Sequence, residues 1–220
     1  MLEEVSRITA EAGRIAAGRC GSAFRRWEKV PGHPVCDTDL EVDSFLHENL
    51  KALDPDAGWL SEETLDTAHR YACRRVWIVD PIDGTRDYLR NRPGWCVSVA
   101  LVEDRAPIIG VLDAPARAEH WMAQKGKGAW RNGQRLRVSG RKELAGARVP
   151  ADQLPNVDKD LVAVPKPNSI ALRIAMVAAG DADLVATLRW GFEWDIAAAA
   201  LIATGAGATV EKRRNAATEK

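Results

Sequence analysis

The run from Trp77 to Thr85 (WIVDPIDGT) holds the residues with the clearest chemical potential in this chain. An apolar stretch leads to Asp80 and Asp83, which lie on either side of a Pro-Ile step. Carboxylates at this spacing suit Mg2+, which prefers oxygen ligands and usually keeps waters of its own. The backbone N–H groups of Gly84 and Thr85, at the start of an expected short helix, could hold a phosphate beside that metal. The alternative interpretation is a strand that ends in an Asp-Pro turn and an Asp-Gly turn.

Three further acidic segments flank this run. Asp39 precedes an expected helix, Glu62 and Glu63 follow a short apolar stretch, and Asp195 opens an alanine-rich helix. Each segment has a structural alternative, because hydroxyl and carboxylate side chains cap helix starts and favour the first helical turn. On that interpretation Ser61, Asp39 and Asp195 are N-caps.

Taken together and in this order, the four segments resemble the inositol monophosphatase family. The family's D-P-I/L-D-G-T signature stands at residues 80–85, its E-E pair at Glu62 and Glu63, and its W-D pair at Trp194 and Asp195. The stretch 124–139 (QKGKGAWRNGQRLRVS) also looks like the hairpin that follows the family's core sheet. The resemblance covers about residues 39–210. It implies an α+β fold, an αβαβα layered sandwich of the inositol monophosphatase and fructose-1,6-bisphosphatase type.

The resemblance also implies a Li+-sensitive phosphomonoesterase that uses two Mg2+ ions and has room for a third. In the family's pattern Glu62, Asp80 and the carbonyl of Ile82 hold the first metal. Asp80, Asp83 and Asp195 hold the second, and the third ion is held weakly beside Glu62. Metal pairs of this kind ease the ionisation of a water and clamp the attacking and leaving oxygens.

Catalytic roles follow from the same resemblance. Glu62 and Thr85 would orient the attacking water, and Asp39 would support Thr85 and the metal-bound waters. Gly84 and Thr85 would bind the phosphate. Glu63 would sit beside these groups without being a direct ligand.

The expected substrate is a small phosphorylated metabolite. The sequence before the E-E pair, Leu60-Ser61, looks like the bisphosphate nucleotidase branch of the family. Inositol phosphatases tend to place an acid seven positions before the final metal-binding aspartate, where this chain has Leu188. We therefore favour a 3'(2'),5'-bisphosphate nucleotidase acting on adenosine 3',5'-bisphosphate, with an inositol-1(or 4)-monophosphatase as the alternative. An alternative of another class is a truncated, catalytically impaired homologue, because family members usually continue with another strand beyond the position of Val210.

Composition limits the partners and the cellular location that the protein can have. Lys plus Arg and Asp plus Glu each number 31, so net charge predicts neither a nucleic-acid polymer nor a membrane surface as partner. The longest apolar run, residues 196–203, is too short to span a bilayer, and no signal peptide is recognisable. We expect a cytoplasmic protein, with a homodimer left open. The four cysteines have no metal-ligand spacing and indicate reduced thiols rather than zinc. The four histidines lie in dissimilar settings and predict no Ser/His/Asp arrangement.

Periodicity places helix and strand in alternation. Helices are expected over residues 2–18, 39–53, 169–179 and 196–204, and strands over 76–80, 95–103, 107–112, 118–123 and 182–186. An Asn-Gly turn predicts a hairpin between residues 129–131 and 136–139. We divide the chain into an N-terminal α+β half, residues 1–145, with most metal ligands, and a C-terminal α/β half, residues 146–220, with Asp195. Its tail, residues 211–220, reads as disordered.

Of the eight tryptophans, Trp77, Trp95 and Trp121 occupy strand patterns and are expected in the core. Trp190 and Trp194 precede Asp195. A place in the core and a place in the wall of the substrate site fit these two residues equally well.

Overall fold

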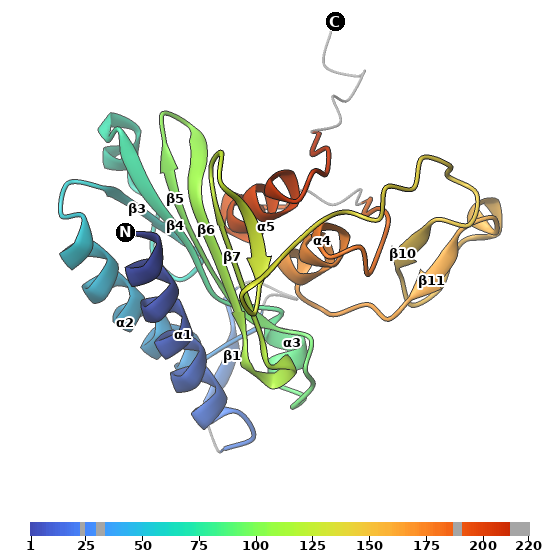
Figure 1. Ribbon diagram of the computed structural model, residues 1–220. Coiled ribbons are helices and arrows are strands. Elements are labelled where there is room, and N and C mark those ends of the chain that lie inside the picture. The colour runs from blue at the N-terminus through green and yellow to red at the C-terminus, as the bar shows by residue number, and fades with distance from the viewer. Residues whose placement is uncertain (23–24, 30–33, 187–190, 212–220) are drawn as a thin grey trace, which may run out of the picture.

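A seven-stranded sheet forms the centre of the molecule in the computed structural model, which describes residues 1–22, 25–29, 34–186 and 191–211 (Figure 1). Its strands follow one another in chain order, with β3 parallel to β4 and every other neighbouring pair antiparallel. The strands are β3 (Gly58–Ser61), β4 (Arg75–Asp83), β5 (Cys96–Glu103), β6 (Ala106–Ala114), β7 (Glu119–Gln124), β8 (Gly128–Arg131) and β9 (Gln134–Arg135).

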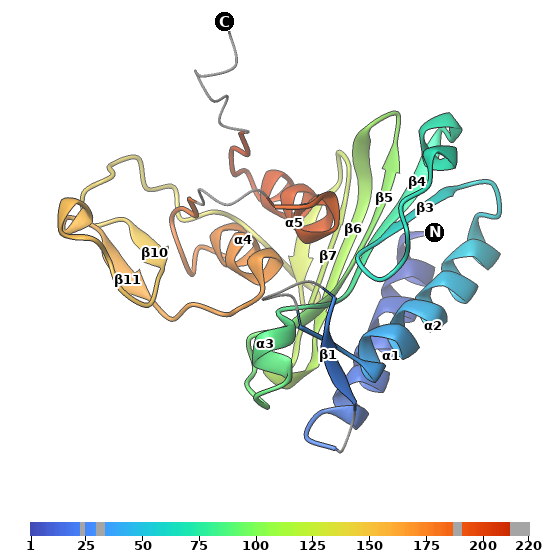
Figure 2. The same cartoon turned by 180° about the vertical axis from the view of Figure 1, so that it is seen from behind.

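Helices cover both faces of this sheet. On one face lie α1 (Leu2–Arg19) and α2 (Asp37–Leu53), and on the other α4 (Ile170–Ala178) and α5 (Glu193–Gly205) (Figures 1 and 2). Each helix pair closes its own apolar core against the sheet. Because both faces are covered, the central strands are buried almost throughout and read as continuous apolar runs.

A small parallel sheet, β10 (Arg148–Pro150) with β11 (Val162–Val164), stands beyond α4 (Figure 1). Helices, large sheet, helices and small sheet thus form the first four layers of the expected αβαβα sandwich, and the described residues contain no further α-helix for a fifth layer. The remaining elements are short: β1 (Arg26–Glu28), β2 (Pro34–Cys36), α3 (Thr85–Tyr88), η1 (Ala68–Ala72), η2 (Pro115–Arg117) and η3 (Asn156–Asp158).

The four long helices are confirmed, while two strand predictions are wrong. Residues 182–186 form no strand, because the N–H groups of Asp183 and Leu184 both donate to the carbonyl of Arg148, at 2.8 and 3.3 Å. This segment therefore turns past β10 instead of pairing along it. Residues 136–139 leave the sheet soon after β9, since the N–H of Val138 donates to the carbonyl of Ala206, the residue directly after α5. The division of the chain near residue 145 stays a prediction, and residues 212–220 lie outside the described part.

Trp77, Trp95 and Trp121 are at most 1% exposed, so their expected place in the core is confirmed. Trp194 is partly buried against the core beneath α5, and its ring stacks on that of Phe192 with centroids 4.6 Å apart. Trp190 falls outside the described residues.

One arrangement contradicts the expectation from the histidines. The Oγ of Ser6 in α1 lies 2.7 Å from Nε2 of His120 in β7, and Nδ1 of His120 lies 2.7 Å from Oδ1 of Asp113 in β6. Residues 114 apart in the sequence form this chain, so no local pattern reveals it. It joins α1 to two strands, and we interpret it as a structural clamp between the helix and the sheet.

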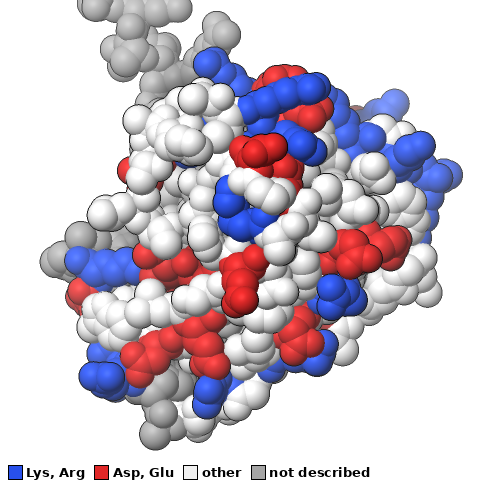
Figure 3. Space-filling model, turned by 90° about the vertical axis from the view of Figure 1, so that its left-hand side faces the viewer, with Lys and Arg blue, Asp and Glu red and all other residues white. Residues whose placement is uncertain are grey.

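The surface carries mixed charge. On the face shown in Figure 3, acidic and basic side chains are intermixed, in keeping with the zero net charge. No helix in the described part of the chain has the length and apolar character needed to cross a membrane.

Candidate metal and phosphate site

Three aspartates converge where β4 ends and α5 begins. One carboxylate oxygen each from Asp80, Asp83 and Asp195 lies within 4.8 Å of the other two. Residues three apart on a regular strand point to opposite faces. Here the β4–β5 register shifts between Asp80 and Asp83, which oppose Ser98 and Cys96, and such a bulge turns a side chain toward a new direction. The irregularity in β4 therefore brings both carboxylates to one site.

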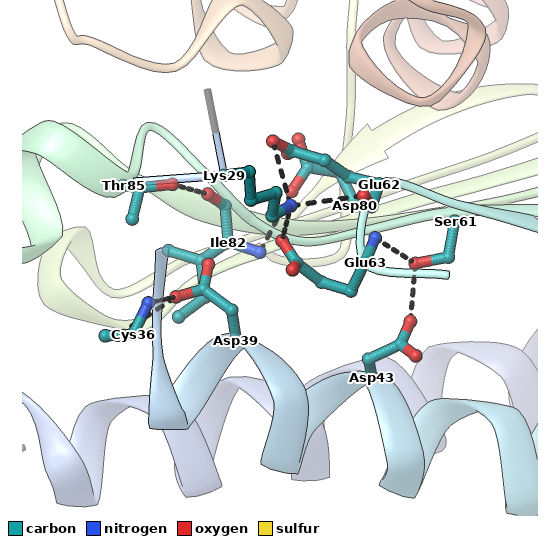
Figure 4. Close-up of polar contacts among 10 residues, drawn as sticks. All are labelled: Lys29, Cys36, Asp39, Asp43, Ser61, Glu62, Glu63, Asp80, Ile82 and Thr85. Carbon is teal, nitrogen blue, oxygen red and sulfur yellow. Dashed lines mark hydrogen bonds and ion pairs between the residues drawn. The ribbon is translucent and has the colours of Figure 1, made fainter. Parts of the chain in front are cut away.

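The loop after β4 is held by short-range hydrogen bonds. Oδ1 of Asp80 accepts from the N–H of Ile82 at 3.0 Å, and Oγ1 of Thr85 donates to the carbonyl of Ile82 at 3.1 Å (Figure 4). Gly84 has φ +97°, and a Cβ there would lie 2.7 Å from the carbonyl oxygen of Gly94. Only glycine suits this position, because other residues meet both backbone strain and a steric clash. The carbonyl predicted as a metal ligand is thus held beside the Thr85 hydroxyl.

Asp83 is bound by the start of α4. Its Oδ2 accepts from Oγ of Ser169 at 2.5 Å and from the N–H of Ala171 at 2.8 Å, and its Oδ1 accepts from the N–H of Ile170 at 3.3 Å. Ser169 is a functional candidate that the sequence analysis missed. Its place just before an apolar helix is typical of an N-cap, but nothing along the chain connects it to an aspartate 86 residues earlier.

Asp39 and Asp195 occupy equivalent positions in two capping boxes. Oδ2 of Asp39 accepts from the backbone N–H of Cys36 at 2.8 Å, and Oδ2 of Asp195 accepts from the N–H of Phe192 at 2.8 Å. The N-cap positions belong to Cys36 and Phe192, so the alternative of Asp39 and Asp195 as N-caps is wrong. Each aspartate is the third residue of its helix, and its side chain accepts from the backbone N–H of the N-cap residue.

The acidic pair is bound by a lysine that no sequence pattern indicated. Nζ of Lys29 donates to Oε1 of Glu63 at 2.5 Å and to the carbonyl of Glu62 at 3.1 Å, and lies 3.6 Å from Oε1 of Glu62 (Figure 4). Ser61 caps no helix: its hydroxyl donates to Oδ1 of Asp43 at 2.5 Å and accepts from the N–H of Glu63. The tight three-aspartate cluster does not include Glu62 among the described residues.

Burial and mutual repulsion raise the pKa of several of these carboxyl groups. For Asp80, burial and the charges of Glu62, Asp83 and Asp195 raise the pKa well above its ordinary value. Burial raises the pKa of Asp83 to about 7 against the opposing effect of its hydrogen bonds, and that of Asp39 to about 6. Several acids that resist ionisation side by side are a favourable setting for a cation, which removes the repulsion.

The donor set fits Mg2+. Every candidate ligand is a carboxylate or carbonyl oxygen, and hard oxygen donors are what Mg2+ prefers. Asp80 is 1% exposed and Asp83 is 6% exposed, so two of the three carboxylates are held inside the protein, while Asp195 is only partly buried.

This chain belongs to the inositol monophosphatase family, whose model matches residues 1–216. It is 30% identical to inositol monophosphatase 2 of Solanum lycopersicum over 95% of its own length and 87% of that protein. It is 28% identical to the 3'(2'),5'-bisphosphate nucleotidase CysQ of Aggregatibacter actinomycetemcomitans over 96% and 83% of the two chains. The solved structure of a Thermotoga maritima IMPase superposes with a TM-score of 0.84 at 29% identity, covering 94% of this chain and 83% of that one. The fold and the phosphatase family expected from the four acidic segments are thereby confirmed.

Proposed function

We propose that this protein is a Mg2+-dependent phosphomonoesterase that hydrolyses a small phosphorylated metabolite. The observation that carries the proposal is the convergence of Asp80, Asp83 and Asp195 within 4.8 Å at the end of β4. Membership of a phosphatase family supports the same class of reaction.

The proposed ligand set is the one expected from the sequence. Glu62, Asp80 and the carbonyl of Ile82 would hold one ion, and Asp80, Asp83 and Asp195 a second, with a third ion weakly bound at Glu62. When bound, Mg2+ lowers the pKa of a water and offsets the charge of the phosphate. The Lys29 ammonium already lies 3.6 Å from Oε1 of Glu62. A third ion at Glu62 would therefore have to displace this lysine or share the carboxylate with it.

The proposed catalytic groups surround the loop after β4. Thr85 and Glu62 would orient the attacking water, with the Thr85 hydroxyl already directed at the Ile82 carbonyl. Asp39 would support this arrangement from the start of α2, where its carboxylate is fixed by Cys36. The N–H groups of Gly84 and Thr85 would contact the phosphate.

For the substrate we propose adenosine 3',5'-bisphosphate, with inositol 1-phosphate as the second candidate. The Leu60-Ser61 context before Glu62 supports the nucleotide. So does the Phe192 ring beside Asp195, which is 54% exposed and backed by Trp194, since exposed aromatic rings stack well on nucleobases. Leu188, the other sequence argument, lies outside the described residues.

The test is phosphate release from adenosine 3',5'-bisphosphate, inositol 1-phosphate and fructose 1,6-bisphosphate, with Mg2+ and with excess EDTA. We expect release only with Mg2+ and the largest kcat/KM for the nucleotide. Full activity in EDTA would refute the metal-dependent mechanism. A larger kcat/KM for inositol 1-phosphate would refute the substrate assignment alone.

Lithium sensitivity is part of the proposal. Li+ is similar to Mg2+ in size but carries a single charge, so it would occupy a metal position without activating water. We expect Li+ to inhibit at concentrations where Na+ does not, measured as phosphate release at fixed Mg2+. Equal responses to the two salts would contradict this expectation. The cytoplasmic location and the homodimer stay predictions. Sedimentation analysis would test the homodimer.

A further inference from the structure

We infer that Ser169 is a positioning residue for Asp83, and that the start of α4 determines which oxygen of this carboxylate faces a metal ion. The inference rests on the proposed function, because it concerns the metal site on which that function depends. It adds a residue outside the acidic segments and assigns the two oxygens of Asp83 different tasks.

The two oxygens of Asp83 are not equivalent. Oδ2 accepts two short hydrogen bonds, from the Ser169 hydroxyl at 2.5 Å and from the Ala171 N–H at 2.8 Å. Among the described residues, Oδ1 has one long contact, with the N–H of Ile170 at 3.3 Å. A carboxylate oxygen offers about two lone-pair positions, so Oδ2 is saturated and Oδ1 keeps the capacity to bind a cation.

The direction of the Ser169 hydrogen bond follows from its neighbours. Its hydroxyl oxygen accepts from the N–H of Leu172 at 2.9 Å, which is the N-cap interaction of α4. A hydroxyl has one proton and two lone pairs, so accepting from Leu172 leaves the proton free for Asp83. Ser169 is fully buried, and the short distance is typical of a hydrogen bond to an ionised carboxylate. One side chain thus caps the helix and orients Asp83.

The helix start is itself fastened to the connection that follows Asp83. The N–H of Ser169 donates to the carbonyl of Gly94 at 2.8 Å, and the N–H of Asn168 donates to Oδ2 of Asp87 at 3.1 Å. Asp87 and Gly94 both belong to the connection between β4 and β5. Ser169 therefore presents its hydroxyl from a fixed backbone, which is what a positioning residue requires.

The experiment separates orientation of Asp83 from capping of α4. Glycine replaces serine at an N-cap with little loss of helix stability, but it has no hydroxyl to donate. Ser169→Gly is therefore the test variant, and Ser169→Ala is a second variant that keeps the β-carbon. Ser169→Thr retains the hydroxyl and serves as the conservative rescue. Mg2+ is titrated into metal-free protein while the melting temperature is followed, and phosphate release is measured separately.

We expect Ser169→Gly to melt close to the wild type in EDTA and to need about 10- to 100-fold more Mg2+ for half of its thermal shift, the usual effect of losing a residue that orients a metal ligand. Activity should show the same displacement of the Mg2+ midpoint, with kcat largely recovered at saturating Mg2+. Ser169→Thr should lie near the wild type.

An unchanged Mg2+ midpoint in both Ser169→Gly and Ser169→Ala would overturn the inference, as would a wild type whose melting temperature ignores Mg2+. A wild type that binds Mg2+ but hydrolyses no phosphomonoester would refute the proposed function alone. In that case a shifted thermal midpoint in the variants would still support the role of Ser169.

Discussion

At the scale of single residues, the site is defined by buried carboxyl groups whose charges raise one another's pKa. Asp80 lies buried among Glu62, Asp83 and Asp195, and each of these raises its pKa further. Lys29 compensates the neighbouring acidic pair directly, since its ammonium contacts Glu63 and Glu62, and its charge also lowers the pKa of Asp39. A folded protein without metal therefore carries electrostatic repulsion at this site, which a divalent cation would relieve.

This repulsion leads to a prediction for Asp80→Asn. The variant removes a proposed ligand of both ions, so phosphate release should fall by about 100-fold or more, and the Mg2+-induced thermal shift should be largely lost. In EDTA, however, the variant should melt above the wild type, because the amide removes a buried like charge. Thermal melts with and without Mg2+ check both statements.

Asp104→Asn is the matched control, because its exposed side chain lies in the turn between β5 and β6. It should leave both melts and the activity unchanged. If Asp80→Asn is destabilised in EDTA, repulsion is not the dominant effect of Asp80 in the metal-free state.

At the scale of elements, the site depends on how closely α5 packs on the sheet. A Cβ added to Gly110 in β6 would lie 2.7 Å from the carbonyl oxygen of Ala198 in α5. Gly110→Ala should push α5 outward and displace Asp195 at its start. We expect a loss of about 1–3 kcal/mol in unfolding free energy and a higher Mg2+ requirement, measured by urea unfolding and Mg2+ titration.

Gly18→Ala is the control for this prediction. Nothing lies within 4 Å of a Cβ at this helical position, so alanine should be neutral or stabilise α1 by up to about 1 kcal/mol. A Gly110→Ala protein with normal stability and normal Mg2+ dependence would show that α5 tolerates the added methyl group.

The clamp formed by Ser6, His120 and Asp113 gives a second prediction at this scale. His120→Ala leaves the largely buried carboxylate of Asp113 without its imidazole partner. We expect unfolding free energy to fall by about 1–3 kcal/mol in urea, with the Mg2+ midpoint unchanged, because none of the three clamp residues is a proposed metal ligand.

His69→Ala provides the comparison for the clamp. This histidine is exposed, and its substitution should change stability by no more than about 0.5 kcal/mol. Equal stability of His120→Ala and the wild type would show that the hydrogen-bonded chain contributes nothing measurable.

At the scale of the whole molecule, folding brings carboxyl groups from both helix layers and the sheet to one place. Burial raises the pKa of Asp39 to about 6 and that of Glu63 to about 7, above the ordinary values of these groups in the unfolded chain. The folded state therefore binds protons more tightly than the unfolded state in this range. The stability that these protonated carboxyl groups contribute is fully present at low pH. It is lost as the pH rises through the raised pKa values of the folded state.

We accordingly expect the metal-free protein to melt at a lower temperature at pH 8 than at pH 6, in EDTA. With saturating Mg2+ the difference should shrink or reverse, because the cation binds the ionised carboxylates of the folded state and stabilises it. Differential scanning calorimetry across this pH range is the measurement. A metal-free melting temperature that rises from pH 6 to pH 8 would contradict the raised pKa values as a cause.

The amino-acid sequence by itself determined the chemistry of the site and most of its scaffold. Asp80, Asp83 and Gly84 stand so close together that they must lie at the same strand end, although the irregular pairing of β4 with β5 is what turns both carboxylates to one site. The long helices were predictable for a similar reason, because apolar residues at a period of 3.6 need a single face against a core. Both signals are local.

Only the tertiary structure decided which distant groups support these residues. Ser169 meets Asp83 across 86 residues and Lys29 meets Glu63 across 34, through hydrogen bonds whose partners share no sequence period. The failed strand over residues 182–186 has the same origin, since two of its N–H groups donate to a carbonyl at the start of β10. Such pairings depend on how the helices and the small sheet pack against the large one, because a hydrogen bond needs its donor and acceptor within about 3 Å, which chain order does not set.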